Sequence, residues 1–211
     1  MRYFWKYPAR FLEWLLDGLF YLPSGGEKRF KKRCISNTGL TAGMRVLDLC
    51  CGKGYLSSMI AELLGGEGQV IGLDIDGNSL NMAIAETNWA NVHFINADSG
   101  HIPLSPDIID SCLILLGMHH MSADMRATTL SEVYRVLKTG GCLFIVDYGL
   151  SSNLFSRIAA RTIVGIIEDD AAYRMLMDRS LWNEAIRACF TKKKKKSIQG
   201  QVIQILQLEK R

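Results

Sequence analysis

The chain has 211 residues, of which 48% are apolar and 22% charged, and its formal net charge is +4. This size and composition predict a globular protein with one core and a small appendage. Residues 1–33 carry eight Lys and Arg against three acids, and residues 192–211 carry seven against one. An acidic middle between basic ends disfavours a protein whose main face grips nucleic acid, because that function needs a basic groove across the core.

Residues 1–22 are predicted to form an amphipathic helix that is rich in aromatic residues, since apolar side chains recur at helical spacing. Its apolar stretch contains two acids and is too short to span a bilayer. The helix either covers the core, lines an apolar substrate pocket through Trp14, or rests on a membrane interface. With the Gly/Ser linker and the basic stretch that follow, residues 1–33 are expected to cap the site.

From residue 44 onward, short apolar strands alternate with helices. The expected elements, in chain order, are Val46–Leu49, 55–64, Val70–Asp74, 78–88, Val92–Asn96, Ile108–Leu116, Ser122–Leu137, Cys142–Tyr148, 181–189 and Val202–Leu208. This alternation predicts an α/β fold with a parallel sheet and helices on both of its faces. Ligands of such sheets bind outside the carboxyl ends of the strands. Residues 149–180 are less regular, and we expect a helical insertion over the site there.

The most informative stretch is VLDLCCGKG, residues 46–54. It reads as a buried strand that enters a tight turn of small residues, with a helix beginning near Tyr55. Small residues let the backbone approach a ligand closely, and a helix N-terminus offers free N–H groups. No third glycine follows Gly54 at the dinucleotide spacing, which argues against a pyrophosphate site.

Three acids stand at or near the ends of consecutive predicted strands. Asp48 lies within the first strand, Asp74 ends the second, and Asp98 follows the third. They converge at one edge of the sheet, where each needs a partner because an unpaired buried carboxylate is costly. Asp74 suits a ribose diol, Asp98 an exocyclic amine and Asp48 an ammonium group. Together with the turn, they predict a site for a nucleoside with an amino-acid tail and no phosphate.

In order and spacing, five motifs resemble those of the class I S-adenosylmethionine-dependent methyltransferases, over about residues 40–150. They are VLDLCCGKG (46–54), VIGLDID (70–76), NADSGHIPL (96–104), IDSCLILLGMHHM (109–121) and EVYRVLKTGGCLFIVD (132–147). The last is similar to the form found in ubiquinone/menaquinone-biosynthesis and related small-molecule methyltransferases. The resemblance implies a methyltransferase domain over residues 34–211, built on a Rossmann-like seven-stranded sheet. Its strand order would be 3-2-1-4-5-7-6, with the last strand antiparallel.

The resemblance also implies S-adenosylmethionine as cofactor and S-adenosylhomocysteine as product. The residues implied to bind it are Asp48, Cys50, Gly52, Gly54, Asp74, Ile75, Asp98, Ser99 and Leu115. Gly52 and Gly54 would let the backbone approach the methionine half, and Ile75 would pack on the adenine. The family's first motif usually has glycine where Cys50 stands. A Cβ is tolerable at this position if φ is negative, but it narrows the turn.

Methyl transfer asks little of the protein, because the sulfonium is already activated and alignment supplies most of the rate. A base helps only if the nucleophile arrives protonated. His119 and His120 are the best-placed candidates for that base, and at most one should face the site, since adjacent residues in a turn rarely point the same way. The alternative is that they shape the pocket or pack on the next helix. Asp147 and Tyr148 are further substrate-pocket candidates.

The lysine run Lys192–Lys196 falls on the sixth strand, which lies at the sheet edge in this family. Lysines on an edge strand block edge-to-edge pairing, and their stems can cover apolar surface. Contact with anionic lipid or with nucleic acid is the alternative. The six cysteines form no CxxC and no Cys/His metal spacing, so we expect no metal, reduced thiols and a cytoplasmic location. The N-terminal helix leaves a peripheral membrane contact open.

We therefore expect a methyltransferase that acts on a small apolar or aromatic acceptor, quinol-like or lipid-like, with no nucleic-acid partner. An RNA or protein methyltransferase is one alternative, although the chain has no Asn/Asp-Pro-Pro-Tyr motif and no Pro-Cys nucleophile. A cofactor-binding partner protein without catalysis is the other, because Cys50 departs from the usual motif and no clear base stands out.

Overall fold

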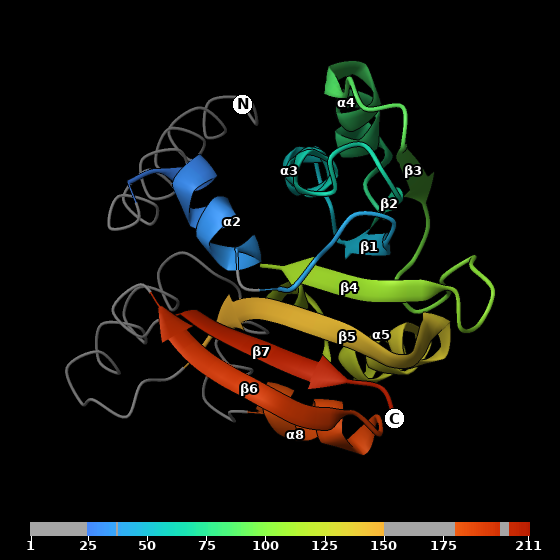
Figure 1. Cartoon of the computed structure of the whole chain (residues 1–211). Coiled ribbons are helices and arrows are strands. Elements are labelled where there is room, and N and C mark those ends of the chain that lie inside the picture. Colours follow the sequence, from blue (N-terminus) through green and yellow to red (C-terminus); the bar gives the residue numbers. More distant parts are fainter. Residues whose placement is uncertain (1–24, 37, 150–179, 199–202) are drawn as a thin grey trace, which may run out of the picture.

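The structure is a computed structural model, and it describes residues 25–36, 38–149, 180–198 and 203–211. In these residues a seven-stranded sheet runs through the molecule (Figure 1). Its order is β3-β2-β1-β4-β5-β7-β6; β7 is antiparallel to both of its neighbours, and the other pairs are parallel. The predicted fold class and strand order are confirmed. The predicted helix over 1–22, including Trp14, and residues 150–179 of the predicted insertion lie outside the described residues.

The elements are α2 (Glu27–Ile35), β1 (Arg45–Leu49), α3 (Tyr55–Leu63), β2 (Gln69–Asp74), α4 (Gly77–Glu86), β3 (Val92–Asn96), β4 (Ile109–Leu115), η2 (Met118–His120), α5 (Ala123–Val136), β5 (Leu137–Tyr148), α8 (Ser180–Arg187), β6 (Thr191–Ile198) and β7 (Ile203–Glu209). Most agree with the predicted ranges to within two residues. The exceptions are α2, which occupies the predicted basic stretch, and β5, which starts five residues early.

Both exceptions have a physical cause. In α2 the buried residues Phe30 and Cys34 are four apart, so a narrow apolar stripe faces the core although most of the helix is charged. The early start of β5 depends on two other segments: Leu137 pairs with Ile109 of β4, and the glycines that follow pair with the C-terminal residues. Gly140 N donates to the Lys210 carbonyl at 2.9 Å, and Lys210 N donates to the Gly141 carbonyl at 3.0 Å. Residues 137–141 are therefore held in the sheet by pairing with these two segments, although Gly140 has a φ of +79°.

Apolar residues of the central strands alternate between two cores, one on each face of the sheet. Val46, Val70 and Leu113 share one core with residues of α3, whereas their neighbours Leu47 and Ile71 belong to the other core, which also contains residues of α5 and α8. This alternation follows from the two-residue period of a strand. With both faces covered, the carboxyl ends of β1, β2 and β4 are the places where the sheet can meet a ligand.

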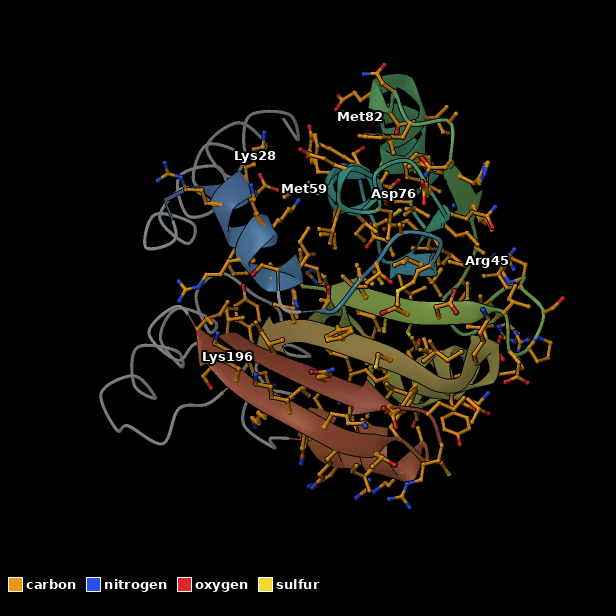
Figure 2. The ribbon with its side chains drawn as sticks, viewed as in Figure 1. Lys28, Arg45, Met59, Asp76, Met82 and Lys196 are labelled. Carbon is orange, nitrogen blue, oxygen red and sulfur yellow. The ribbon has the colours of Figure 1, made fainter. Side chains whose placement is uncertain are left out.

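The lysine run lies on β6, which is an edge strand of this sheet. Lys193 pairs with Glu209 at 2.6 Å, and the Lys192 ammonium lies 4.9 Å from the centre of the Trp182 ring. Lys196 projects from the same strand (Figure 2). Of the helices described, none is long and apolar enough to cross a bilayer.

Candidate functional site

The turn after β1 is built on left-handed backbone. Cys50 has φ +60°, Gly52 +51° and Gly54 +72°. Cys51 N donates to the Leu73 carbonyl at 3.1 Å, which fastens the turn to the end of β2. Cys50 thus does not adopt the negative φ at which its Cβ would be tolerable. A non-glycine residue in this conformation costs roughly 1–2 kcal/mol, so Cys50 is strained.

The two predicted glycines of the turn have different surroundings. A Cβ at Gly52 would meet nothing within 4 Å, so this residue leaves open space beside the backbone. A Cβ at Gly54 would lie 2.7 Å from Phe94 Cζ and 2.9 Å from Ala83 Cβ. Gly54 is buried and caps the start of α3. Close packing of α3 against β3 and α4 is sufficient to require glycine there.

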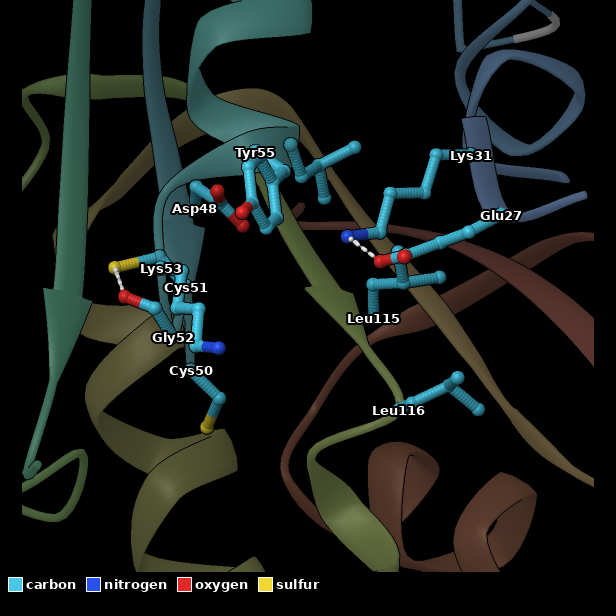
Figure 3. Close-up of a pocket in the computed structure, with 11 residues that line it drawn as sticks. Glu27, Lys31, Asp48, Cys50, Cys51, Gly52, Lys53, Tyr55, Leu115 and Leu116 are labelled. Atoms are coloured by element: carbon cyan, nitrogen blue, oxygen red, sulfur yellow. Dashed lines mark hydrogen bonds and ion pairs between the residues drawn. The ribbon is translucent and has the colours of Figure 1, made fainter. Parts of the chain in front are cut away.

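A cavity of about 360 Å³ lies beside this turn (Figure 3). Among the predicted residues, it is lined by Asp48, Cys50, Gly52 and Leu115. Asp48 is 1% exposed, and the Ser57 hydroxyl donates to its Oδ2 at 2.6 Å. Burial, offset in part by that hydrogen bond, raises the pKa of Asp48 to about 7. A cation placed in this cavity would favour the ionised carboxylate.

A second cavity, of about 290 Å³, lies at the ends of β2, β3 and β4. Its lining includes the predicted residues Asp74, Ile75, Asp98 and Ser99. Asp74 Oδ2 accepts from Gly52 N at 2.7 Å and Oδ1 accepts from Asp76 N at 2.9 Å, which fixes the carboxylate and leaves each oxygen a lone pair. The Ile75 side chain at the wall of this cavity is 70% exposed, and so large an exposure is unusual for an isoleucine.

The two cavities adjoin, because Cys50 and Leu116 line both of them. Both residues have positive φ, +60° and +54°. The combined site is therefore elongated. Glu27, Lys31 and Asp48 line its first part, and the second part has both the acids Asp74 and Asp98 and the exposed apolar residues Ile75 and Met125. This lining is compatible with the predicted roles, in which the base would pack on Ile75, the ribose would meet Asp74 and the amino-acid tail would lie beside Asp48.

His119 and His120 are placed differently. His120 lines the second cavity, whereas His119 is 3% exposed and its Nδ1 lies 2.8 Å from Asp147 Oδ1. Asp147 is fully buried and also accepts from the backbone N–H groups of Met118, His119 and Tyr148 at 2.9, 3.2 and 2.7 Å. Tyr148 is buried, and its ring packs edge-on against the His119 ring, with the two ring centres 4.9 Å apart. The end of β5 and η2 thus share one polar cluster.

Several residues that line the cavities were missed from the sequence. They are Glu27, Lys31, Cys51, Lys53, Tyr55, Leu56, Leu73, Ala97, Met121 and Met125. Met125 is 46% exposed. It could have been found from the sequence, because it is an apolar residue on the polar side of the helix predicted over 122–137. Lys31 and Glu27 had the weaker signal of opposite charges four residues apart in a basic stretch.

A sheet of this order, with a glycine turn after β1 and a carboxylate at the end of β2, defines the Rossmann-like S-adenosylmethionine-dependent methyltransferases. Residues 40–207 match the model of a family described as "Methyltransferase domain", and the chain belongs to that family. It is accordingly a methyltransferase whose cofactor is S-adenosylmethionine.

Three similar proteins illustrate the relationship. An uncharacterized methyltransferase of Synechocystis sp. is 28% identical over 203 residues, which cover 96% of this chain and 93% of that one. A ubiquinone/menaquinone biosynthesis C-methyltransferase of Marinomonas sp. is 33% identical over 171 residues, 74% of this chain and 67% of that one. The crystal structure of an S-adenosylmethionine-dependent methyltransferase from Aquifex aeolicus superposes with a TM-score of 0.69 at 18% identity, covering 90% and 96% of the two chains, and it shares the fold.

Proposed function

We propose that this methyltransferase acts on a small aromatic acceptor of the quinol class. The observation that carries the proposal is the 33% identity to a C-methyltransferase of ubiquinone and menaquinone biosynthesis over three quarters of this chain. The cofactor supplies a methyl group activated by its positively charged sulfur. The acceptor must then present a nucleophilic ring atom, and a quinol becomes nucleophilic when a hydroxyl gives up its proton.

The buried pair His119 and Asp147 supports a proton-accepting role. Three backbone N–H groups donate to the Asp147 carboxylate, so its oxygens act as acceptors. Its contact with His119 Nδ1 at 2.8 Å then assigns the proton of the neutral imidazole to Nδ1. Asp147 would stabilise the imidazolium formed when the His119 ring takes a second proton. We propose His119 as the base and Asp147 as the residue that positions it.

The test is methyl transfer to reduced short-chain benzoquinones and naphthoquinones, followed by mass spectrometry of the product. The wild-type chain should methylate at least one of these quinols, and the oxidised quinones should not react. Asp74→Ala, which should weaken cofactor binding, serves as the negative control. Cofactor binding without transfer to any quinol would overturn the acceptor class.

A second measurement separates a base from a structural clamp. His119→Asn keeps a hydrogen-bond donor beside Asp147 but cannot take up a proton near neutral pH. We expect kcat to fall at least 100-fold and the acidic limb of the pH–rate profile to disappear, with the thermal midpoint little changed. If His119 only holds η2 to β5, stability will fall and the shape of the pH profile will stay.

A lipid-soluble acceptor leads us to propose peripheral contact with anionic membranes. Lys194 and Lys196 of β6 line a small cleft together with Cys34, near the end of α2, and Lys32 and Arg33 of α2 are exposed. The end of α2 and the lysines of β6 thus border the same cleft. Co-sedimentation with vesicles containing a third phosphatidylserine should exceed that with neutral vesicles and fall on adding salt. Equal binding to both vesicle types would refute the contact.

A further inference from the structure

Helix α2 places an ion pair over the cavity beside the glycine turn. The Lys31 ammonium lies 2.6 Å from Glu27 Oε1, and both residues line the cavity with Asp48. In Figure 3 the Lys31 side chain extends from α2 toward the middle of this cavity. No strand-end motif contributes these two residues, because α2 precedes the first strand.

The setting of this pair differs from that of an ordinary pair on a helix surface. Glu and Lys four residues apart commonly pair in solvent and stabilise a helix by about 0.2–0.5 kcal/mol. Here the Lys31 side chain is only 15% exposed, and its ammonium lies 5.2 Å from the centre of the Tyr55 ring, across the cavity on α3. The lysine is directed into the site and away from bulk water, which a purely helix-stabilising pair does not require.

The charges of the cavity match those of a free amino acid. The tail of the cofactor ends in an ammonium and a carboxylate. Asp48 is an acid that can meet the ammonium, and the carboxylate needs a cation. Two lysines line the cavity: Lys53, in the turn after β1, is exposed, whereas the Lys31 side chain is only 15% exposed. We propose that Lys31 binds the carboxylate of the cofactor's amino-acid tail and that Glu27 positions the Lys31 ammonium for this contact. Bound in this way, the cofactor joins α2 to the turn after β1.

The test compares ligands that differ only in this tail, using calorimetric titration of the full chain. S-adenosylhomocysteine has the whole tail, and 5′-deoxy-5′-methylthioadenosine lacks it. Lys31→Met keeps the apolar stem and removes the charge. Loss of a hydrogen-bonded ion pair predicts a 10- to 100-fold weaker Kd for S-adenosylhomocysteine. The Kd for methylthioadenosine should change less than about twofold. Lys31→Arg should retain most of the affinity for S-adenosylhomocysteine.

Lys28 provides the matched control, since it lies one turn away on the same helix. It borders a neighbouring groove between α2 and α3, opposite Met59, and does not line this cavity (Figure 2). Lys28→Met should leave both affinities unchanged. A parallel loss for both ligands in Lys31→Met, or no loss for either, would overturn the proposal. The inference rests on the cofactor and not on the acceptor, so a failed quinol assay leaves it intact.

Discussion

Replacement of Cys50 offers a direct test of how the turn after β1 stores strain. At most positions glycine is less stable than alanine by about 0.5–1 kcal/mol, because glycine loses more backbone entropy on folding. At φ +60° an alanine keeps a left-handed strain of roughly 1–2 kcal/mol that glycine does not have. The two effects oppose each other, and the strain is larger. We therefore expect Cys50→Gly to be more stable than Cys50→Ala by about 0.7 kcal/mol.

Urea denaturation of both variants measures this difference. With a slope of about 2 kcal/mol per molar urea, the midpoint of Cys50→Gly should lie about 0.3 M above that of Cys50→Ala. Cys142 in β5 is the control, because its φ is not positive. There the usual order should hold, with Cys142→Ala the more stable variant. If Cys50→Ala equals or exceeds Cys50→Gly in stability, the turn is not strained at Cys50.

Three further variants probe the same region and the packing around it. A Cβ at Gly117 would lie 2.8 Å from Cys50 Cβ. Gly117→Ala should therefore lower the free energy of unfolding by about 1–3 kcal/mol in the wild type but by little in a Cys50→Gly background. Equal losses in the two backgrounds, measured by urea unfolding, would disprove the contact. Burial raises the pKa of Asp48 from 3.8 to about 7, so its contribution to stability is complete below about pH 4 and lost as pH rises to about 7. Asp48→Asn should remove this pH dependence of the free energy of unfolding, measured with urea between about pH 4 and 7. An unchanged dependence on pH would contradict the assignment to Asp48. Glu184 holds the buried Arg126 guanidinium at 2.7 and 2.8 Å, so Glu184→Ala should lower the free energy of unfolding by about 3–5 kcal/mol; a loss below 1 kcal/mol would contradict this.

The parts of the site that follow from strand periodicity could be predicted from the sequence. Asp48 and Asp74 end or nearly end buried parallel strands, and such ends meet at one edge of the sheet whatever the loops do. The backbone at Cys50 could not be predicted in the same way. Its φ depends on how the turn is fastened to Leu73 and Asp74, which lie more than twenty residues further along the chain.

The histidines show a second limit. Two adjacent histidines after β4 suggested that at most one would face the site. Which one does so depends on η2, whose tight 3₁₀ turn rotates successive side chains by about 120°. His120 then borders the second cavity and His119 turns toward Asp147. That partner comes from the next strand, whose register with β4 no local pattern reveals.

The charged end of the site required the tertiary structure most of all. Opposite charges at Glu27 and Lys31 are common on helices and indicate only a helix surface. Their meaning comes from Phe30 and Cys34, which are buried on the same helix and so fix the face that α2 turns to the sheet. With that face fixed, Glu27 and Lys31 lie over Asp48. The apolar stripe that anchors α2 is thus also what orients its cation, and a substitution that loosened Phe30 would weaken tail recognition without touching the cavity.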